Sequence, residues 1–170
     1  TIPHIYQEQY YLHINDHDGF FREYVEPFLL VLCKYIFPGN TLYQDQLLQH
    51  LYLEFYDLWK RDHRETLIDG SSFFMSFFDG VYDEIEDFLM GMLNTTFVYS
   101  TVDVLASEKL SPRKAHIVTQ IYGLHEAKGD QLTLSQILLY YPDYSFLEII
   151  YTYGDIFYFL YRDYLSYVTT

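Results

Sequence analysis

The sequence predicts an all-α protein: one domain over residues 1–170, folded as a compact bundle of roughly five to seven helices with little or no sheet. Helix start and stop motifs recur along the chain, and apolar residues between them repeat at helical spacing. Half of the 170 residues are apolar and 21% are aromatic, which is enough for a hydrophobic core. Strand patterns are weak. The opening "TIPHIYQEQYYLHI" alternates loosely, so residues 1–15 are expected to form an extended N-terminal arm.

The first half of the chain carries one predicted helix break and one predicted turn. Pro27 should kink its helix or begin a new one after Glu26, because proline lacks the amide that the helix interior uses. "PGN" at residues 38–40 is a stop signal, and "TLYQ" at residues 41–44 is a capping box. The helix after it carries an apolar stripe at helical spacing: Leu47, Leu48, Leu51, Phe55, Leu58 and Trp59.

The second half contains three further helix starts. "SP" at residues 111–112 combines an N-cap serine with proline at the first helical position, and "KG" at residues 128–129 should end that helix. "TLSQ" at residues 133–136 and "SFLE" at residues 145–148 are capping boxes. The last of these opens a helix that we expect to run to about Val168.

Residues 13–19, "HINDHDG", have the composition of a metal site. If Gly19 is placed at position 6 of an EF-hand calcium loop, Ile14 and Val25 occupy the first and last ligand positions, where oxygen ligands are required. The single Cys33 excludes an internal disulfide and a cysteine-based zinc site. The sequence therefore predicts no metal ion and no cofactor.

The same segment is better interpreted as a helix start. His13 and His17 would share one face of a helix and could bind zinc there. Aspartate and asparagine favour caps and turns, however, so Asp16 or Asp18 is expected to N-cap a helix that begins near Gly19. The two histidines should then lie in solvent.

The charge of the chain limits its partners. Ten Lys and Arg stand against 24 Asp and Glu, a formal net charge of −14. Nucleic acids and anionic membranes are bound through cationic groups, so we expect neither as a direct partner. A basic protein, or self-association through uncharged faces, fits better, and 20 tyrosines are typical of a protein with interfaces. The chain shows no membrane-spanning run and no signal-peptide pattern, so a cytoplasmic location is expected.

An acidic group within "DGVYDEIED", residues 79–87, is the first candidate partner-binding site. Its members are Asp83, Glu84, Glu86 and Asp87. They are either a docking patch for a basic partner or a solvated face near a helix N-terminus, where acids are tolerated. Spacing within one helix cannot establish the cleft that paired-carboxylate catalysis needs.

The C-terminal helix is the second candidate, because it is apolar in nearly every direction. Its second stripe consists of Leu147, Tyr151, Gly154, Tyr158, Tyr161 and Leu165. A helix of this kind is either buried in its own core or covered by another chain. Gly154 permits a close approach, so the second stripe is the predicted interface, with Tyr151, Tyr158, Tyr161 and Leu165 binding the partner. The alternative is that this helix is the central core helix.

Two stretches resemble known families. Within residues 113–165, "AKGDQLTLSQIL" and "YTYGDIFYFLYRDYL" are similar to the helix-turn-helix of TetR-type regulators. That resemblance implies a transcription regulator, but residues 144–153, which would enter the major groove, contain no Arg or Lys and carry Glu148. Residues 20–59 resemble the helix pairs of TorD/NarJ-type chaperones of molybdoenzymes, which are all-helical and acidic, although the acid-Pro-x-Asp-His motif of that family is missing.

Together these patterns favour binding over catalysis. We expect a regulatory or inhibitory protein-interaction module, a homo-oligomer and not an enzyme, with no catalytic or cofactor-binding residues. The rival binding functions are the regulator and the chaperone. The rival from another class is a small helical hydrolase that pairs His63 or His116 with a carboxylate.

Overall fold

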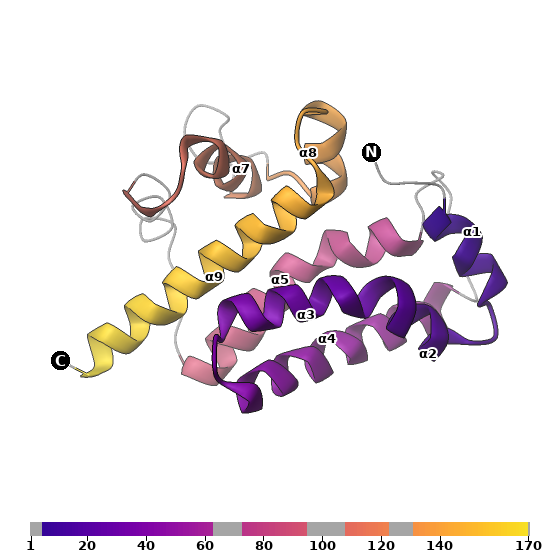
Figure 1. Ribbon diagram of the computed structural model, residues 1–170, viewed down its shortest axis with the longest axis horizontal. Coiled ribbons are helices and arrows are strands. Elements are labelled where there is room, and N and C mark those ends of the chain that lie inside the picture. The colour runs from indigo at the N-terminus through magenta and orange to yellow at the C-terminus, as the bar shows by residue number, and fades with distance from the viewer. Residues whose placement is uncertain (1–4, 63–72, 95–107, 123–130, 170) are drawn as a thin grey trace.

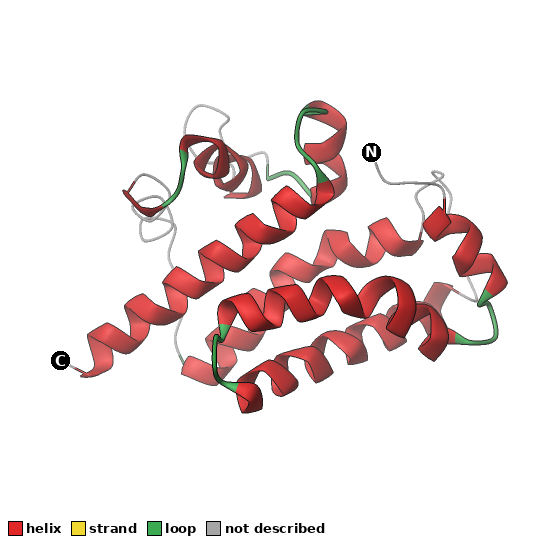
Figure 2. Ribbon diagram, in the orientation of Figure 1, coloured by secondary structure: helices red, strands yellow, loops and turns green. Residues whose placement is uncertain are grey.

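The computed structural model describes residues 5–62, 73–94, 108–122 and 131–169, and every regular element within these ranges is a helix (Figure 2). This confirms the predicted all-α fold. The elements are α1 (Ile5–Leu12), α2 (His17–Phe20), the π-helix η1 (Phe21–Val25), α3 (Glu26–Ile36), α4 (Thr41–Asp62), α5 (Phe73–Leu93), α7 (Pro112–Tyr122), α8 (Leu134–Tyr140) and α9 (Phe146–Thr169). None of the described helices is long and apolar enough to cross a membrane.

The N-terminal segment was predicted to be extended, and this is wrong for residues 5–12, which form α1. Tyr6 and Tyr10 are one helical turn apart, so a helix directs both rings to the same side. There the Tyr6 ring stacks on Phe74 at 4.0 Å and the Tyr10 ring stacks on Phe73 at 5.0 Å. This aromatic packing against α5 outweighs the loose alternation of the sequence.

Asp16 is the N-cap of α2, as predicted, because its side chain accepts a hydrogen bond of 3.1 Å from the Gly19 amide. The two histidines nearby are half-buried, so the expectation that they lie in solvent is wrong. The His13 ring contacts the Gln9 carbonyl at 2.8 Å through Nδ1. The His17 ring lies 4.9 Å from the Tyr56 ring of α4.

The chain is helical without interruption through α2, η1 and α3, and the π-helix lies directly before Pro27. Proline removes one backbone donor and crowds the carbonyl four residues before it. A π-turn widens the helix at this point and relieves both problems. The new helix predicted near Glu26 is therefore observed as a change of helix type, from π to α, within an unbroken helical segment, with α3 beginning at Glu26.

The turn between α3 and α4 uses Gly39 at φ 75°. The Asn40 side chain accepts a bond of 3.0 Å from the Tyr43 amide, so the cap lies one residue before the predicted capping box at residues 41–44. The capping box at Thr133 is confirmed in full. Ser145 accepts a bond from the Glu148 amide at 3.1 Å, consistent with its predicted place at the start of α9.

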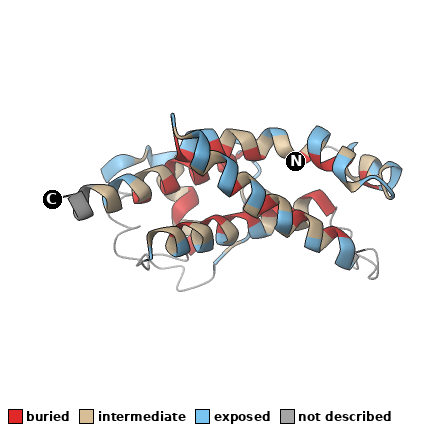
Figure 3. Ribbon diagram, turned by 90° about the horizontal axis from the view of Figure 1, so that it is seen from below, coloured by how far each residue is buried: buried red, intermediate tan, exposed pale blue. Residues whose placement is uncertain are grey.

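Four helices form the centre of the bundle: α3 contacts α4 and α9, and α5 contacts the same two helices (Figure 1). Helix α1 packs on α5, while α7 and α8 contact each other and lie against α9 and α5. The buried faces of the helices face one another (Figure 3). In the predicted stripe of α4, four members are buried and two, Leu48 and Leu58, are half-buried. The four buried ones are Leu47, Leu51, Phe55 and Trp59.

Candidate functional site

The predicted interface stripe of α9 contributes partly to the protein's own core. Gly154 is buried, and a Cβ at this position would lie 2.9 Å from Cδ1 of Tyr35 in α3. Tyr161 is half-buried, with its ring 5.0 Å from Phe37. The close approach that Gly154 permits is therefore made within the chain, to α3. The opposite side of α9 is fully core, with Ile149, Ile150, Tyr153, Ile156, Phe157 and Leu160 buried.

The accessible part of the stripe lies nearer the N-terminal end of α9. Leu147 is 45% exposed, Tyr151 is 40% exposed, and Tyr35 of the neighbouring α3 is 39% exposed. The Tyr35 and Tyr151 rings are 6.1 Å apart, so the two helices present one continuous apolar area. Tyr158, one to two turns further on, is half-buried with the Arg162 guanidinium 5.3 Å from its ring centre. We call these four residues, Tyr35, Leu147, Tyr151 and Tyr158, the α3–α9 surface. Leu165 is half-buried.

The hydroxyl of Tyr35 is hydrogen-bonded to the carboxylate of Asp155 in α9. A hydrogen bond to Asp155, followed by burial, raises the pKa of Tyr35 to about 12, so its hydroxyl stays protonated at neutral pH. Asp155 is itself buried in α9 and forms an ion pair with Lys114 of α7. The ring of Tyr35 is thus oriented by its own chain before any partner binds.

The acidic residues of α5 do not lie together on one surface. Asp83 and Asp87 are exposed and lie four residues apart, and partial burial followed by the charge of Asp87 raises the pKa of Asp83. Glu86 points toward α7, where it accepts a bond of 2.9 Å from the Tyr122 hydroxyl. The Tyr122 hydroxyl is also hydrogen-bonded to that of Tyr82, which is buried.

Glu84 points the other way, toward α4, into a group that sequence reasoning missed. Its Oε2 lies 3.2 Å from Nε2 of His50, and Glu54 follows His50 by one helical turn. One ligand atom from each of His50, Glu54 and Glu84 lies within 4.8 Å of the other two. Among the described residues this is the group of histidine, cysteine and acidic side chains whose spacing suits a metal ion.

Burial and the charge of Glu54, in that order, raise the pKa of Glu84, while the contact with His50 opposes the shift. The two carboxylates also line a small pocket of about 150 Å³, together with Leu58, Arg61, Ser76, Phe77, Gly80 and Val81. The sequence spacing of His50 and Glu54, one turn apart on one helix, could have drawn attention to the pair. The position of the third residue, Glu84, depends on how α5 packs against α4, and no local sequence pattern predicts that packing.

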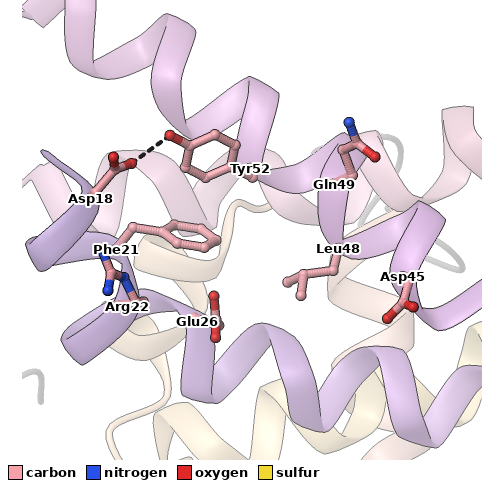
Figure 4. A pocket seen from close by; sticks show the side chains of 8 residues that line it. All are labelled: Asp18, Phe21, Arg22, Glu26, Asp45, Leu48, Gln49 and Tyr52. Atoms are coloured by element: carbon pink, nitrogen blue, oxygen red, sulfur yellow. Dashed lines mark hydrogen bonds between the residues drawn. The ribbon is translucent and has the colours of Figure 1, made fainter. Parts of the chain in front are cut away.

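A larger groove of about 350 Å³ lies between the α2–α3 segment and α4 (Figure 4). Tyr52 donates a hydrogen bond of 2.5 Å to Asp18 at one end and Asp45 lies at the other, with Phe21 and Leu48 between them (Figure 4). Its remaining lining residues are Arg22, Glu26 and Gln49. Three carboxylates thus surround an apolar floor, and one arginine accompanies them.

The hydrolase alternative depends on His63 or His116. His63 lies outside the described residues. His116 is half-buried between aromatic rings, with Nδ1 2.6 Å from the Tyr144 hydroxyl and its ring 4.9 Å from Tyr141. The carboxylate of Glu148 is engaged by Arg113, which lowers the pKa of Glu148. Neither of the two pockets described above is lined by His116.

The fold and these surfaces define an all-α bundle with an exposed aromatic area and a half-buried histidine–carboxylate group. No protein-family model matches the chain, and neither the curated proteins nor the solved structures contain a significant match. The likenesses of residues 113–165 and 20–59 to two families stay predictions.

Proposed function

We propose that this protein is a non-catalytic interaction module with a regulatory or inhibitory role, and that it self-associates through the α3–α9 surface. The observation that carries the proposal is the juxtaposition of Tyr35, Leu147 and Tyr151, three large side chains that are each about two-fifths exposed. Tyrosine gives apolar contact area and a polar tip at low entropic cost, which is why it is enriched in interfaces. A surface shared by two copies of one chain pairs with itself about a two-fold axis.

The groove between the α2–α3 segment and α4 supports a second part of the proposal, a basic partner. Asp18, Glu26 and Asp45 are arranged around Phe21 and Leu48, so the groove suits a segment that combines cationic and apolar side chains. The net charge of −14 favours the approach of such a partner over long distances. The same charge argues against direct binding to DNA, and the cytoplasmic location stays part of this proposal.

The test is the mass of the protein in solution. The full chain should scatter light as an oligomer, and the double variant Leu147→Glu with Tyr151→Glu should be a folded monomer, because four buried charges per dimer would be uncompensated. Leu42→Glu and Leu53→Glu are matched controls, since both leucines are at least half exposed and lie on α4 outside the surface. The controls should keep the oligomeric mass.

Three outcomes would contradict self-association through this surface. The wild-type chain could be monomeric, the double variant could keep the oligomeric mass, or the α4 controls could dissociate the oligomer equally. Circular dichroism on every variant separates loss of association from loss of folding. The positions chosen are exposed, so their replacement should leave the helical content unchanged.

A further inference from the structure

We propose that His50, Glu54 and Glu84 form a binding site for a divalent first-row transition metal ion such as Zn²⁺. The site lies between α4 and α5, where all three side chains are half-buried. It is independent of the α3–α9 surface and of the interaction role proposed above.

The backbone places the three side chains in a favourable arrangement. His50 and Glu54 are four residues apart on α4 and therefore share one helical face. Glu84 reaches this face from α5, and its carboxylate already lies 3.2 Å from the imidazole Nε2 of His50. Ligand atoms about 2.05 Å from a tetrahedral zinc ion lie about 3.3 Å from one another. The observed spacing within 4.8 Å therefore needs only small side-chain rotations to close on an ion.

The electrostatics of the group favour a cation. The Glu54 carboxylate has no hydrogen bond or ion pair to another side chain within the part of the chain that the structure describes. Glu54 and Glu84 place two half-buried carboxylates close together beside His50. Arg61 also lines the adjoining pocket, and Asp87, three residues after Glu84 on α5, adds a further negative charge near it. A bound dication would neutralise both ligand carboxylates.

The site also has room for further ligands. The adjoining pocket of about 150 Å³ gives water access to Glu54 and Glu84, while Gly80 leaves space one turn before Glu84. On the opposite side the Phe88 ring, 5.6 Å from that of His50, restricts the imidazole. Three protein ligands with an open side are typical of exchangeable zinc sites. One imidazole with two carboxylates suits Zn²⁺, Mn²⁺ or Fe²⁺ better than the softer Cu⁺.

The experiment compares melting of the full chain in a chelator with melting in excess Zn²⁺. An ion that binds only the folded state at 100 times its Kd should raise the Tm by about 5 to 10 °C for a chain of this size. His50→Ala, Glu54→Gln and Glu84→Gln should each weaken binding at least tenfold and remove most of that rise. His17→Ala is the matched control, because His17 lies 3.4 Å from Asp18 without a third ligand, and it should keep the full rise.

A direct probe separates this site from adventitious binding to the other histidines. Co²⁺ should bind at one equivalent per chain and give a visible absorption band, which Zn²⁺ removes and which Glu54→Gln weakens. Glu54→Gln keeps the shape of the side chain, so it should fold even if His50→Ala does not. The proposal is wrong if Zn²⁺ leaves the Tm unchanged, if the Glu54→Gln chain binds Co²⁺ as tightly as the wild type, or if His17→Ala abolishes binding.

Discussion

Helix α5 carries a glutamate on the side that faces α4 and another on the side that faces α7, and the two have different surroundings. Glu84 and Glu86 are two residues apart, so they point to nearly opposite sides of the helix. On the α7 flank, Glu86 meets the Tyr122 hydroxyl, and the Tyr82 and Tyr153 rings behind it are buried. On the α4 flank, Glu84 meets His50 and a second carboxylate beside an open pocket.

The two flanks differ in the groups that each carboxylate contacts. On the α7 flank the partner is a neutral donor whose own hydroxyl is hydrogen-bonded to Tyr82, so the network serves the fold. On the α4 flank the partner is a titratable ring, and water reaches the carboxylates through the pocket. The proposed metal ion would therefore be held on the α4 flank, where three ligand atoms lie close together, and not by the single carboxylate that meets Tyr122.

The largest expected effect comes from breaking the Tyr122–Glu86 network. Tyr122→Phe removes the donor to Glu86 and leaves the buried Tyr82 hydroxyl without this partner, so unfolding should become easier by about 2 kcal/mol. Tyr52→Phe is the control, because its bond to Asp18 is exposed and its loss should cost well under 1 kcal/mol. Urea denaturation measures both. Equal losses for the two variants would mean that the Tyr122–Glu86 network is no better protected than an exposed hydrogen bond.

The sequence predicted the α5 acids but not their separation into two flanks. Local signals were reliable where they act locally: Asp16, Thr133 and Pro27 cap or break helices as their chemistry requires. Positions that depend on packing were not predictable. The extended arm failed because Tyr6 and Tyr10 find aromatic partners on α5, more than sixty residues away.

The dependence on packing also explains why the α9 stripe was assigned to an interface and why the proposed metal ligands were missed. Helical spacing correctly identified which residues share a face, but not which helix would cover that face. Gly154 was assigned to an interface and is covered by Tyr35 of the same chain. His50 and Glu54 were visible as a pair one turn apart, and only the α4–α5 contact adds Glu84.

Acidification should produce a moderate rise in stability to which both flanks contribute. Burial is the first cause that raises the pKa of Asp83, Glu84 and Glu86. The folded state then binds protons before the unfolded state, so stability rises as the pH falls from neutral toward the ordinary glutamate value of 4.5. We expect the Tm to be a few degrees higher at about pH 5.5 than at about pH 7.5 in a chelator.

The gain in stability ends at a lower pH limit, and two variants test which carboxylates cause it. The pKa of Glu148 is lowered, chiefly by its bond to Arg113. The contribution of Glu148 to stability is therefore lost as the pH falls through that lowered pKa. The pH of greatest stability lies above that pKa. Glu84→Gln and Glu86→Gln should each flatten the rise between the two pH values. A Tm that is flat or falls on acidification in the wild type would show that burial does not penalise these carboxylates.

The smallest effect tests whether the α4 flank is as open as its geometry indicates. A Cβ at Gly80, beside the pocket, would meet nothing within 4 Å, and the same holds for Gly91, away from the pocket on the same helix. Glycine costs a helix about 0.5 to 1 kcal/mol relative to alanine, so Gly80→Ala and Gly91→Ala should both stabilise the fold by about that amount. Gly154→Ala should destabilise it, since Tyr35 must move aside. Thermal melts in a chelator give all three values. A gain at Gly91 with a loss at Gly80 would mean that the space beside Glu84 is filled in solution, and the contrast between the two flanks of α5 would then disappear.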